Sequence, residues 1–235
     1  FNMCRPLELV FSNGWDKGEK ISIETGKVEN MTSFEEFFEA YKKQQEYNIS
    51  LLVNADNAID VAHATRCPLP FLSCMVDDCI KRGKTVQEGG AVYNFTGPQG
   101  FGIANMADSL YAIRKLAFDE KKVTLGEWKR ALAMNYGEGL DAISAAEIVT
   151  QIVKEMEEKG MTPGEAEIAE MLRTVMTTEL PEEEKKRYQE IRAMIEEVPK
   201  FGNDNEEVDY FAREVAYTYT RPPLKYHNPR GGQFQ

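Results

Sequence analysis

Apolar residues recur every three or four positions along most of this chain, which predicts a helix-rich protein. The run Ser33-Phe-Glu-Glu is a capping box, in which two side chains satisfy the free amides of a first helical turn. It begins a helix that carries Phe34, Phe37 and Tyr41 on one face and runs to about Leu52 or beyond. Further helices are expected over 3–12, 54–65, 71–81, 103–120, 124–134, 144–159, 163–176, 181–198 and 205–219. The run Thr124-Leu-Gly-Glu is a second capping box, and Pro181 and Asn205 stand at the starts of the last two helices.

Glycine and proline divide these helices. The prolines of the segment 67–70 interrupt the chain between two helices, because each lacks an amide hydrogen and disfavours helix in the residue before it. The polar segment 15–31 is expected to be an exposed excursion, and 135–141 is a glycine-rich break. The last segment, 221–235, holds three prolines and a Gly-Gly pair and is therefore expected to be extended.

One stretch differs from the helical pattern. Residues 91–95 are β-prone and are followed by a Gly/Pro loop that reaches Gly102. A single strand among helices leaves its backbone groups without a partner. We therefore expect this chain to be an internal part of a larger α/β architecture.

Composition excludes several classes of function. The net charge of −11 argues against non-specific binding to nucleic acid or to an anionic membrane. No apolar run approaches the roughly 20 residues that span a bilayer, and the first residues do not form a signal peptide. The four cysteines form no Cys-x-x-Cys pair and only two histidines are present, so no metal site is expected. Reduced cysteines, mostly in the core of a cytoplasmic protein, are the simplest interpretation.

The loop after residue 95 holds the candidate binding residues, because enzymes often place their chemistry on loops that follow strands. We expect Asn94, Thr96, Gln99 and Phe101 to line a pocket for a small substrate. The alternative is structural: Asn94 and Thr96 cap a turn or a helix, and Phe101 packs in the core. Elsewhere, Asp60 and His63 lie three residues apart on a predicted helix and are spaced to form a hydrogen-bonded pair.

Several segments resemble the glycerol dehydratase branch of the glycyl radical enzymes, which also include pyruvate formate-lyase. The most specific is Tyr93-Asn-Phe-Thr-Gly-Pro-Gln, followed by Asp108-Ser-Leu. The others are 7–14, 33–37, 55–64, 68–73, 199–204 and 228–232. The resemblance implies a ten-stranded α/β barrel wrapped in helices, within which a cysteine loop and a glycine loop meet.

The resemblance also implies a radical mechanism. A partner activating enzyme, with S-adenosylmethionine and an iron–sulfur cluster, takes a hydrogen from the loop glycine. The glycyl radical then forms a thiyl radical, which abstracts hydrogen from a small polar substrate. Relatives are often homodimers, and the oxygen sensitivity of the radical implies anaerobic cytoplasm. A chain with this resemblance is expected to belong to a dehydratase or to another lyase that breaks a carbon–heteroatom bond.

Neither radical motif occurs in these 235 residues: no cysteine lies in Gly-Cys-Val-Glu and no glycine lies in Arg-Val-x-Gly-Tyr. We therefore assign no catalytic residue and expect this chain alone to be inactive. The region of about 134–187 is longer than expected for glycerol dehydratase and is interpreted as a helical insertion. Two alternatives stay open: a non-catalytic helical scaffold, or a family member that acts as a sulfite lyase, a decarboxylase or a formate acetyltransferase.

Overall fold

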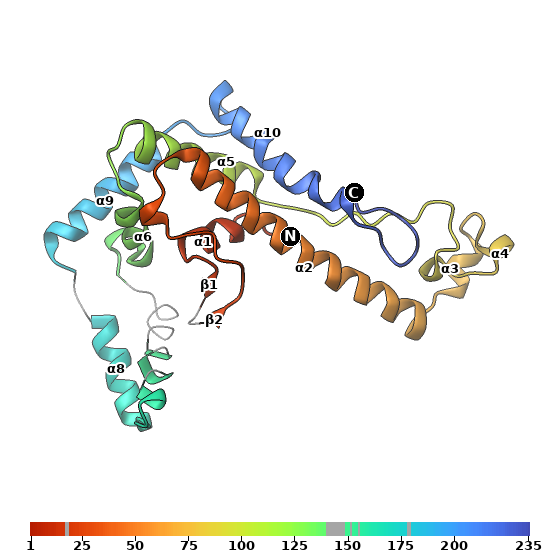
Figure 1. The fold of residues 1–235 in the computed structure, drawn as a ribbon, viewed down its shortest axis with the longest axis horizontal. Coiled ribbons are helices and arrows are strands. Elements are labelled where there is room, and N and C mark those ends of the chain that lie inside the picture. Colours follow the sequence, from red (N-terminus) through yellow and green to blue (C-terminus); the bar gives the residue numbers. More distant parts are fainter. Residues whose placement is uncertain (17–18, 140–148, 151, 155, 178–179) are drawn as a thin grey trace. The chain divides into compact units, whose positions relative to one another are not determined.

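The computed structural model describes residues 1–16, 19–139, 149–150, 152–154, 156–177 and 180–235 (Figure 1). The chain divides into two compact units. Unit 1 comprises Phe1–Glu8, Phe38–Ser109 and Lys200–Gln235, and unit 2 comprises Leu9–Phe37 and Leu110–Pro199. The described α-helices are α1 (Arg5–Phe11), α2 (Phe34–Arg66), α3 (Pro70–Cys74), α4 (Cys79–Arg82), α5 (Ile103–Ile113), α6 (Leu125–Ala133), α8 (Glu165–Thr177), α9 (Glu182–Glu197) and α10 (Glu206–Thr220).

The long helix α2 joins two predicted helices, 33–52 and 54–65, into one. No glycine or proline occurs where they meet, and Val53 there is buried. At the start of α2 the Ser33 hydroxyl accepts a hydrogen bond from the Glu36 amide at 3.2 Å. The Glu36 carboxylate, however, accepts from the amide of Thr32. Half of the predicted capping box is thus formed, and α2 ends at Arg66, where the Pro68–Pro70 segment was expected to stop it.

Unit 1 is built on α2 residues 38–66 and on α10. Asn205 caps α10, because its Oδ1 accepts a hydrogen bond from the Val208 amide at 3.2 Å. Tyr41 is fully buried, and its hydroxyl donates to the Met3 carbonyl at 3.2 Å. Burial raises the pKa of Tyr41. The other large apolar side chains buried in this unit include Ile49, Met106, Phe211, Val215 and Phe234.

The prediction of one helix over 71–81 is wrong. Two short helices, α3 and α4, replace it, and Asp78 between them lies in the left-handed region at φ 71°. An Asp side chain tolerates this conformation better than most residues do. The Asp78 carboxylate also pairs with Arg82 at 2.9 Å, which stabilises the turn.

The prediction of a strand over 91–95 is also wrong. The side-chain amide of Asn94 donates to the Ala91 carbonyl at 2.9 Å, which holds the segment as a turn. In the described part of the chain, extended pairing here is limited to isolated bridges, Thr96 with Phe234 and Asn2 with Phe101. A strand requires a partner along its length, and the backbone of the neighbouring tail pairs with this part of the chain only at Thr96.

Unit 2 contains the only two strands among the described residues, β1 (Trp15–Asp16) and β2 (Glu19–Lys20), which pair antiparallel. They lie within the predicted excursion 15–31. α5 continues into a π-helical turn, Arg114–Asp119, so the predicted helix 103–120 is present with a widened last turn. α8 and α9 confirm the predictions over 163–176 and 181–198. The predicted helix 144–159 lies partly outside the described residues, and its described positions 149–150, 152–154 and 156–158 are helical.

The predicted capping box at the start of α6 is complete. The Thr124 hydroxyl accepts from the Glu127 amide at 3.1 Å, and the Glu127 carboxylate accepts from the Thr124 amide. α6 packs against α9, and both place side chains in the core of unit 2, such as Trp128 and Ile191. Within the described ranges, no helix is both long and apolar enough to cross a membrane.

Candidate functional site

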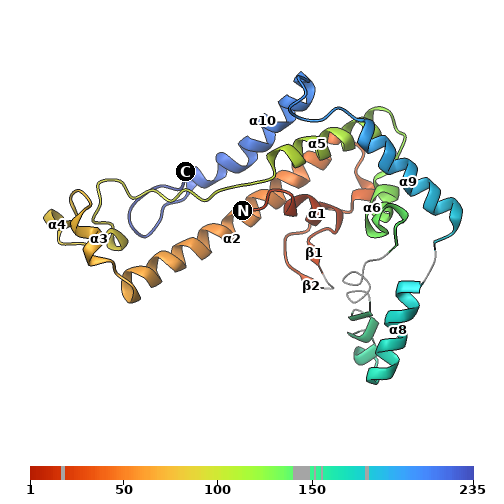
Figure 2. The same ribbon diagram turned by 180° about the vertical axis from the view of Figure 1, so that it is seen from behind.

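The predicted binding loop lies against the C-terminal tail within unit 1. Figures 1 and 2 show the chain that follows α4 running beside the tail that follows α10. The Thr96 amide donates to the Gln233 carbonyl at 3.1 Å, and the Gln235 amide donates to the Thr96 carbonyl at 2.9 Å. The backbone of Thr96 is therefore held on both sides by the tail.

Two glycines allow this close approach. A Cβ atom on Gly232 would overlap the backbone carbonyl of Asn94, and it would lie 2.7 Å from the Phe95 nitrogen. Gly89, at φ +81°, faces the Arg230 carbonyl, which a Cβ there would approach to 2.6 Å. Glycine is required at both positions because the neighbouring atoms are backbone and cannot rotate away.

Asn228 joins the tail to the loop through its side chain, which is almost fully buried. Its Nδ2 donates to the Asn94 carbonyl at 2.6 Å and to the Thr96 hydroxyl at 2.8 Å. Its Oδ1 accepts from the amides of Arg230 at 3.0 Å and Gly232 at 2.9 Å. All four hydrogen-bonding positions of this amide are thus used.

Arg230 links the same loop to α2. Its Nε donates to the Asp60 carboxylate at 3.0 Å, and its Nη2 donates to the Thr96 hydroxyl at 2.9 Å. Both side chains of the ion pair are about one-fifth exposed, at 19% for Arg230 and 20% for Asp60. The predicted Asp60–His63 pair is wrong, because the Asp60 carboxylate faces the tail and His63 is exposed.

The four predicted pocket residues are not equivalent. Asn94 and Thr96 lie together in this network, whereas Gln99 and Phe101 are exposed beyond it. Phe101 is 63% exposed, so it does not pack in the core of unit 1, and its backbone pairs with that of Asn2. Four clefts of the described ranges, two of them in unit 2 next to α6, are lined by other residues and by none of these four.

Neither Asn228 nor Asp60 was expected at this site from the sequence. The signal for Asn228 and Arg230 was the Asn-Pro-Arg-Gly-Gly run at 228–232, in which two glycines permit a tight backbone approach. Asp60 carried no comparable signal, because its partner lies 170 residues away.

Burial and neighbouring charge shift the pKa values of two groups near this loop. Asp56, one turn before Asp60 on α2, has its pKa raised, first by burial and then by the Asp60 charge. Burial also raises the pKa of Tyr219, whose hydroxyl donates to the Pro98 carbonyl at 2.7 Å. The Asn94 Oδ1 is buried and has no hydrogen-bond partner among the described residues. These groups can bind and orient a polar ligand.

The cysteines and the possible metal ligands of the described ranges do not form a reactive site. All four cysteines are free thiols, and only Cys79 is buried, so the expectation that most of them lie in the core is wrong. Burial, followed by the nearby Glu8 charge, raises the pKa of the Cys4 thiol, which makes it less nucleophilic. No group of three potential metal ligands occurs among the described residues.

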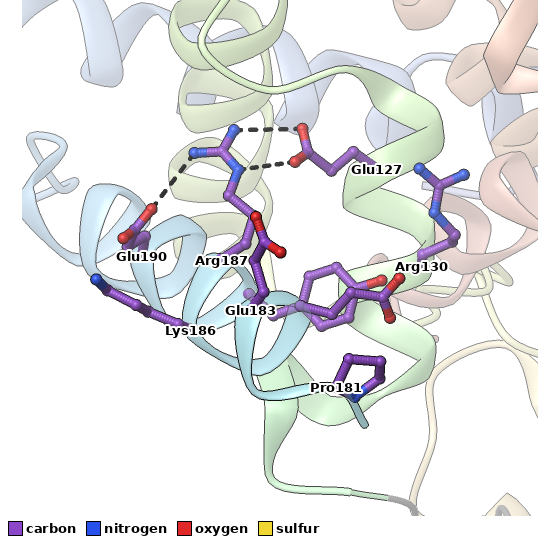
Figure 3. A pocket seen from close by; sticks show the side chains of 9 residues that line it. Glu127, Arg130, Pro181, Glu183, Lys186, Arg187 and Glu190 are labelled. Atoms are coloured by element: carbon purple, nitrogen blue, oxygen red, sulfur yellow. Dashed lines mark hydrogen bonds and ion pairs between the residues drawn. The ribbon is translucent and has the colours of Figure 1, made fainter. Parts of the chain in front are cut away.

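A second candidate is a cleft of about 640 Å³ in unit 2, lined by residues of α6 and α9 (Figure 3). Arg187 crosses it and binds Glu127 through Nε at 2.8 Å, and a longer contact of 3.8 Å reaches Glu190. The hydrogen bond and charge of Arg187 lower the pKa of Glu127. The central cation is thus paired with carboxylates of the cleft itself, which indicates a link between two helices rather than a ligand site.

This link predicts a pH dependence. The lowered pKa of Glu127 contributes stability above the pKa of an unfolded glutamate, about 4.3. That contribution is lost as the pH falls through the lowered pKa. We expect Glu127→Gln to lower the thermal midpoint of unit 2 at pH 7, and the difference from the native chain to shrink as the pH falls below about 4.3 and to vanish once the pH is below the lowered pKa of Glu127. Thermal unfolding followed at each pH measures this.

The matched control is Glu39→Gln, which breaks the Lys42 pair on α2, whose side chains are 41% and 56% exposed. An exposed pair of this kind contributes about 0–1 kcal/mol. A difference for Glu127→Gln that stays constant with pH would contradict the ionic role of the Arg187 contact.

A family model and solved structures match this chain over its whole length. The model of the pyruvate formate lyase-like family matches residues 1–235. A solved structure that concerns 1,2-propanediol dehydration in Roseburia inulinivorans is 63% identical, with a TM-score of 0.95, and the match covers 100% of this chain and 28% of that one. The glycerol-bound B12-independent glycerol dehydratase from Clostridium butyricum is 42% identical, with a TM-score of 0.76, over 100% of this chain and 24% of that one.

A curated relative supports the same relationship. The trans-4-hydroxy-L-proline dehydratase of Clostridioides difficile is 44% identical over 144 residues, which are 60% of this chain and 18% of the relative. The whole chain therefore spans about a quarter of the length of the two solved proteins, 28% of one and 24% of the other. With a family match over all 235 residues and a helix-rich fold shared with these structures, the chain belongs to the pyruvate formate lyase-like family of glycyl radical enzymes.

Proposed function

We propose that this chain is part of a glycyl radical dehydratase that removes water from a small diol. The observation that carries the proposal is the 63% identity, at a TM-score of 0.95, to the structure concerned with 1,2-propanediol dehydration. The likeness to glycerol dehydratase, at 42% identity, supports the same substrate class. Propane-1,2-diol is therefore the first substrate to test, with glycerol as the second.

The reaction is a net loss of water that converts the diol to an aldehyde. In the proposed enzyme the radical that starts the reaction is a glycyl radical. An activating enzyme with S-adenosylmethionine and an iron–sulfur cluster installs it. The Gly-Cys-Val-Glu and Arg-Val-x-Gly-Tyr motifs of the family do not occur in these 235 residues, so no radical step is assigned to this chain. Its proposed contribution is to bind and orient the substrate.

The remaining features of the proposal concern the assembled protein. We infer that the chain contributes to a ten-stranded α/β barrel, that residues 134–187 form a helical insertion, and that the enzyme is a cytoplasmic homodimer. The exposed apolar side chains of unit 1 support packing against further protein: Phe71 is 81% exposed and Tyr93 is 83% exposed.

We propose that Asn94, Thr96, Gln99 and Phe101 lie at the substrate pocket. The fixed backbone of Thr96 and the unpartnered Oδ1 of Asn94 support this role for the first two residues. The exposure of Gln99 and Phe101 leaves both side chains accessible to a bound molecule.

The test is anaerobic activation of the full-length protein by its activating enzyme. Electron paramagnetic resonance measures the glycyl radical, and product analysis follows propane-1,2-diol, glycerol and trans-4-hydroxy-L-proline in parallel. We expect a radical signal and formation of propanal from propane-1,2-diol. A radical signal with turnover of a non-diol substrate alone would overturn the substrate assignment, whereas a protein that accepts no radical would support the scaffold interpretation.

A further inference from the structure

The Thr96 hydroxyl occupies an unusual position, because two side-chain donors meet on it. Asn228 Nδ2 lies 2.8 Å from the Thr96 Oγ1, and Arg230 Nη2 lies 2.9 Å from it. A hydroxyl oxygen has two lone pairs and one hydrogen. Both lone pairs are thus engaged, so the oxygen is left to act toward any third group as a donor.

Neither of the two donors is free to turn away. Asn228 uses its Oδ1 on the amides of Arg230 and Gly232, so its amide group cannot flip without losing these bonds. Arg230 is held by the Asp60 carboxylate through Nε at 3.0 Å. Because this ion pair is largely shielded from solvent, its orientation is more strongly enforced than that of a surface pair.

The hydroxyl hydrogen of Thr96 has no acceptor in the part of the chain that the structure describes. The Thr96 backbone amide and carbonyl are already paired with Gln233 and Gln235, so the residue is fixed while its hydroxyl hydrogen is unclaimed. A donor held in place in this way is suited to an oxygen acceptor, and it is poorly suited to an ammonium or another donor.

We propose that Asp60, Arg230 and Asn228 are positioning residues that dedicate the Thr96 hydroxyl to donating its hydrogen to a hydroxyl or carbonyl oxygen of the substrate. This inference rests on the proposed function, and it assigns the polarity of one contact in that site. Asp60 orients Arg230, and Arg230 together with Asn228 orients Thr96. We expect replacement of Asp60 or Arg230 to alter substrate recognition through Thr96, whereas Asn228 also holds the backbone carbonyl of Asn94.

The experiment uses the activated full-length enzyme with propane-1,2-diol as the probe. Thr96→Val removes the hydroxyl at constant shape, and Thr96→Ser keeps it. We expect Thr96→Val to raise KM about tenfold, the effect of one lost hydrogen bond, with the radical signal unchanged. Thr96→Ser should retain the native KM within about threefold.

The double variant separates positioning from a structural role. Arg230→Lys keeps the charge but loses the fork that reaches both Asp60 and Thr96. We expect it to raise KM severalfold in the native background and to have no further effect in the Thr96→Val background. Asp60→Asn should behave in the same way. Independent, additive effects would overturn the proposal.

Arg82→Lys is the matched control. Arg82 also binds a carboxylate, that of Asp78, and it also donates to the loop, to the Ala91 carbonyl at 3.0 Å, but it makes no contact with Thr96. Its substitution should leave KM within about twofold of the native value. A change equal to that of Arg230→Lys would reject the specific role of Arg230.

Amide hydrogen exchange measured on the same variants tests the positioning network independently of turnover, so its failure can be told apart from failure of the proposed function. If the radical-bearing native enzyme converts no diol, the proposed function fails by itself. Faster exchange of the Thr96 amide in both Arg230→Lys and Asp60→Asn would still support the positioning network, and unchanged exchange would reject it.

Discussion

Replacing Gly232 with alanine is expected to separate the binding loop from the C-terminal tail. The new Cβ atom would overlap the Asn94 carbonyl and lie 2.7 Å from the Phe95 nitrogen, both of which are backbone atoms. Relief therefore requires movement of a whole segment. The expected cost is about 3 kcal/mol or more, since overpacking against atoms that rotate costs about 1–3 kcal/mol.

Amide hydrogen exchange measures this cost at the amides of Thr96 and Gln235, which bond across the junction. Gly231→Ala is the matched control, because Gly231 has φ +83° but no atom within 4 Å of an added Cβ. It should cost only about 1 kcal/mol, the strain of a left-handed backbone in a residue with a side chain. Equal effects at the two glycines would show that strain, and not the Asn94 contact, dominates.

Replacing Phe37 with alanine is expected to produce the second large effect, in unit 2. Phe37 is fully buried and meets the rings of Phe11 at 5.7 Å and Phe118 at 6.4 Å. Truncation of a buried phenylalanine costs about 3–5 kcal/mol, because apolar burial is lost and a cavity remains. The ring contacts with Phe11 and Phe118 are lost with it.

The free energy of local opening, from hydrogen exchange in α5 and the first turns of α2, measures this loss. In this chain by itself, Phe71→Ala removes the same atoms at a position that is 81% exposed, and it should change stability by less than about 0.5 kcal/mol. A cost below about 1 kcal/mol at Phe37 would contradict its place at the centre of the aromatic cluster.

The predictions of helices that rested on local signals held best. The Thr124 capping box formed as expected, and the starts of α9 and α10 follow the proline and asparagine that predicted them. Such signals act within a few residues of the chain, so their outcome depends little on distant partners.

The predictions that failed depended on partners. Residues 91–95 have β-prone side chains, yet the tail pairs with the loop at Thr96 alone, and Asn94 closes a turn instead. The Asp60–His63 pair had suitable helical spacing, but Asp60 meets a stronger donor, the guanidinium of Arg230. Spacing along a helix shows which residues can contact each other. It does not show whether a residue from a distant part of the chain forms a stronger contact with one of them.

The sequence by itself determined the helix-rich class, the main breaks between helices and the family, because each is written in residues that lie close together along the chain. Only the tertiary structure decided that Thr96 receives hydrogen bonds from Asn228 and Arg230, which lie 132 and 134 residues away. It also decided that Gly232 must lack a side chain. The physical reason is that hydrogen bonds and steric overlap act over a few ångströms in space, and which residues meet at that distance depends on the path of the whole chain.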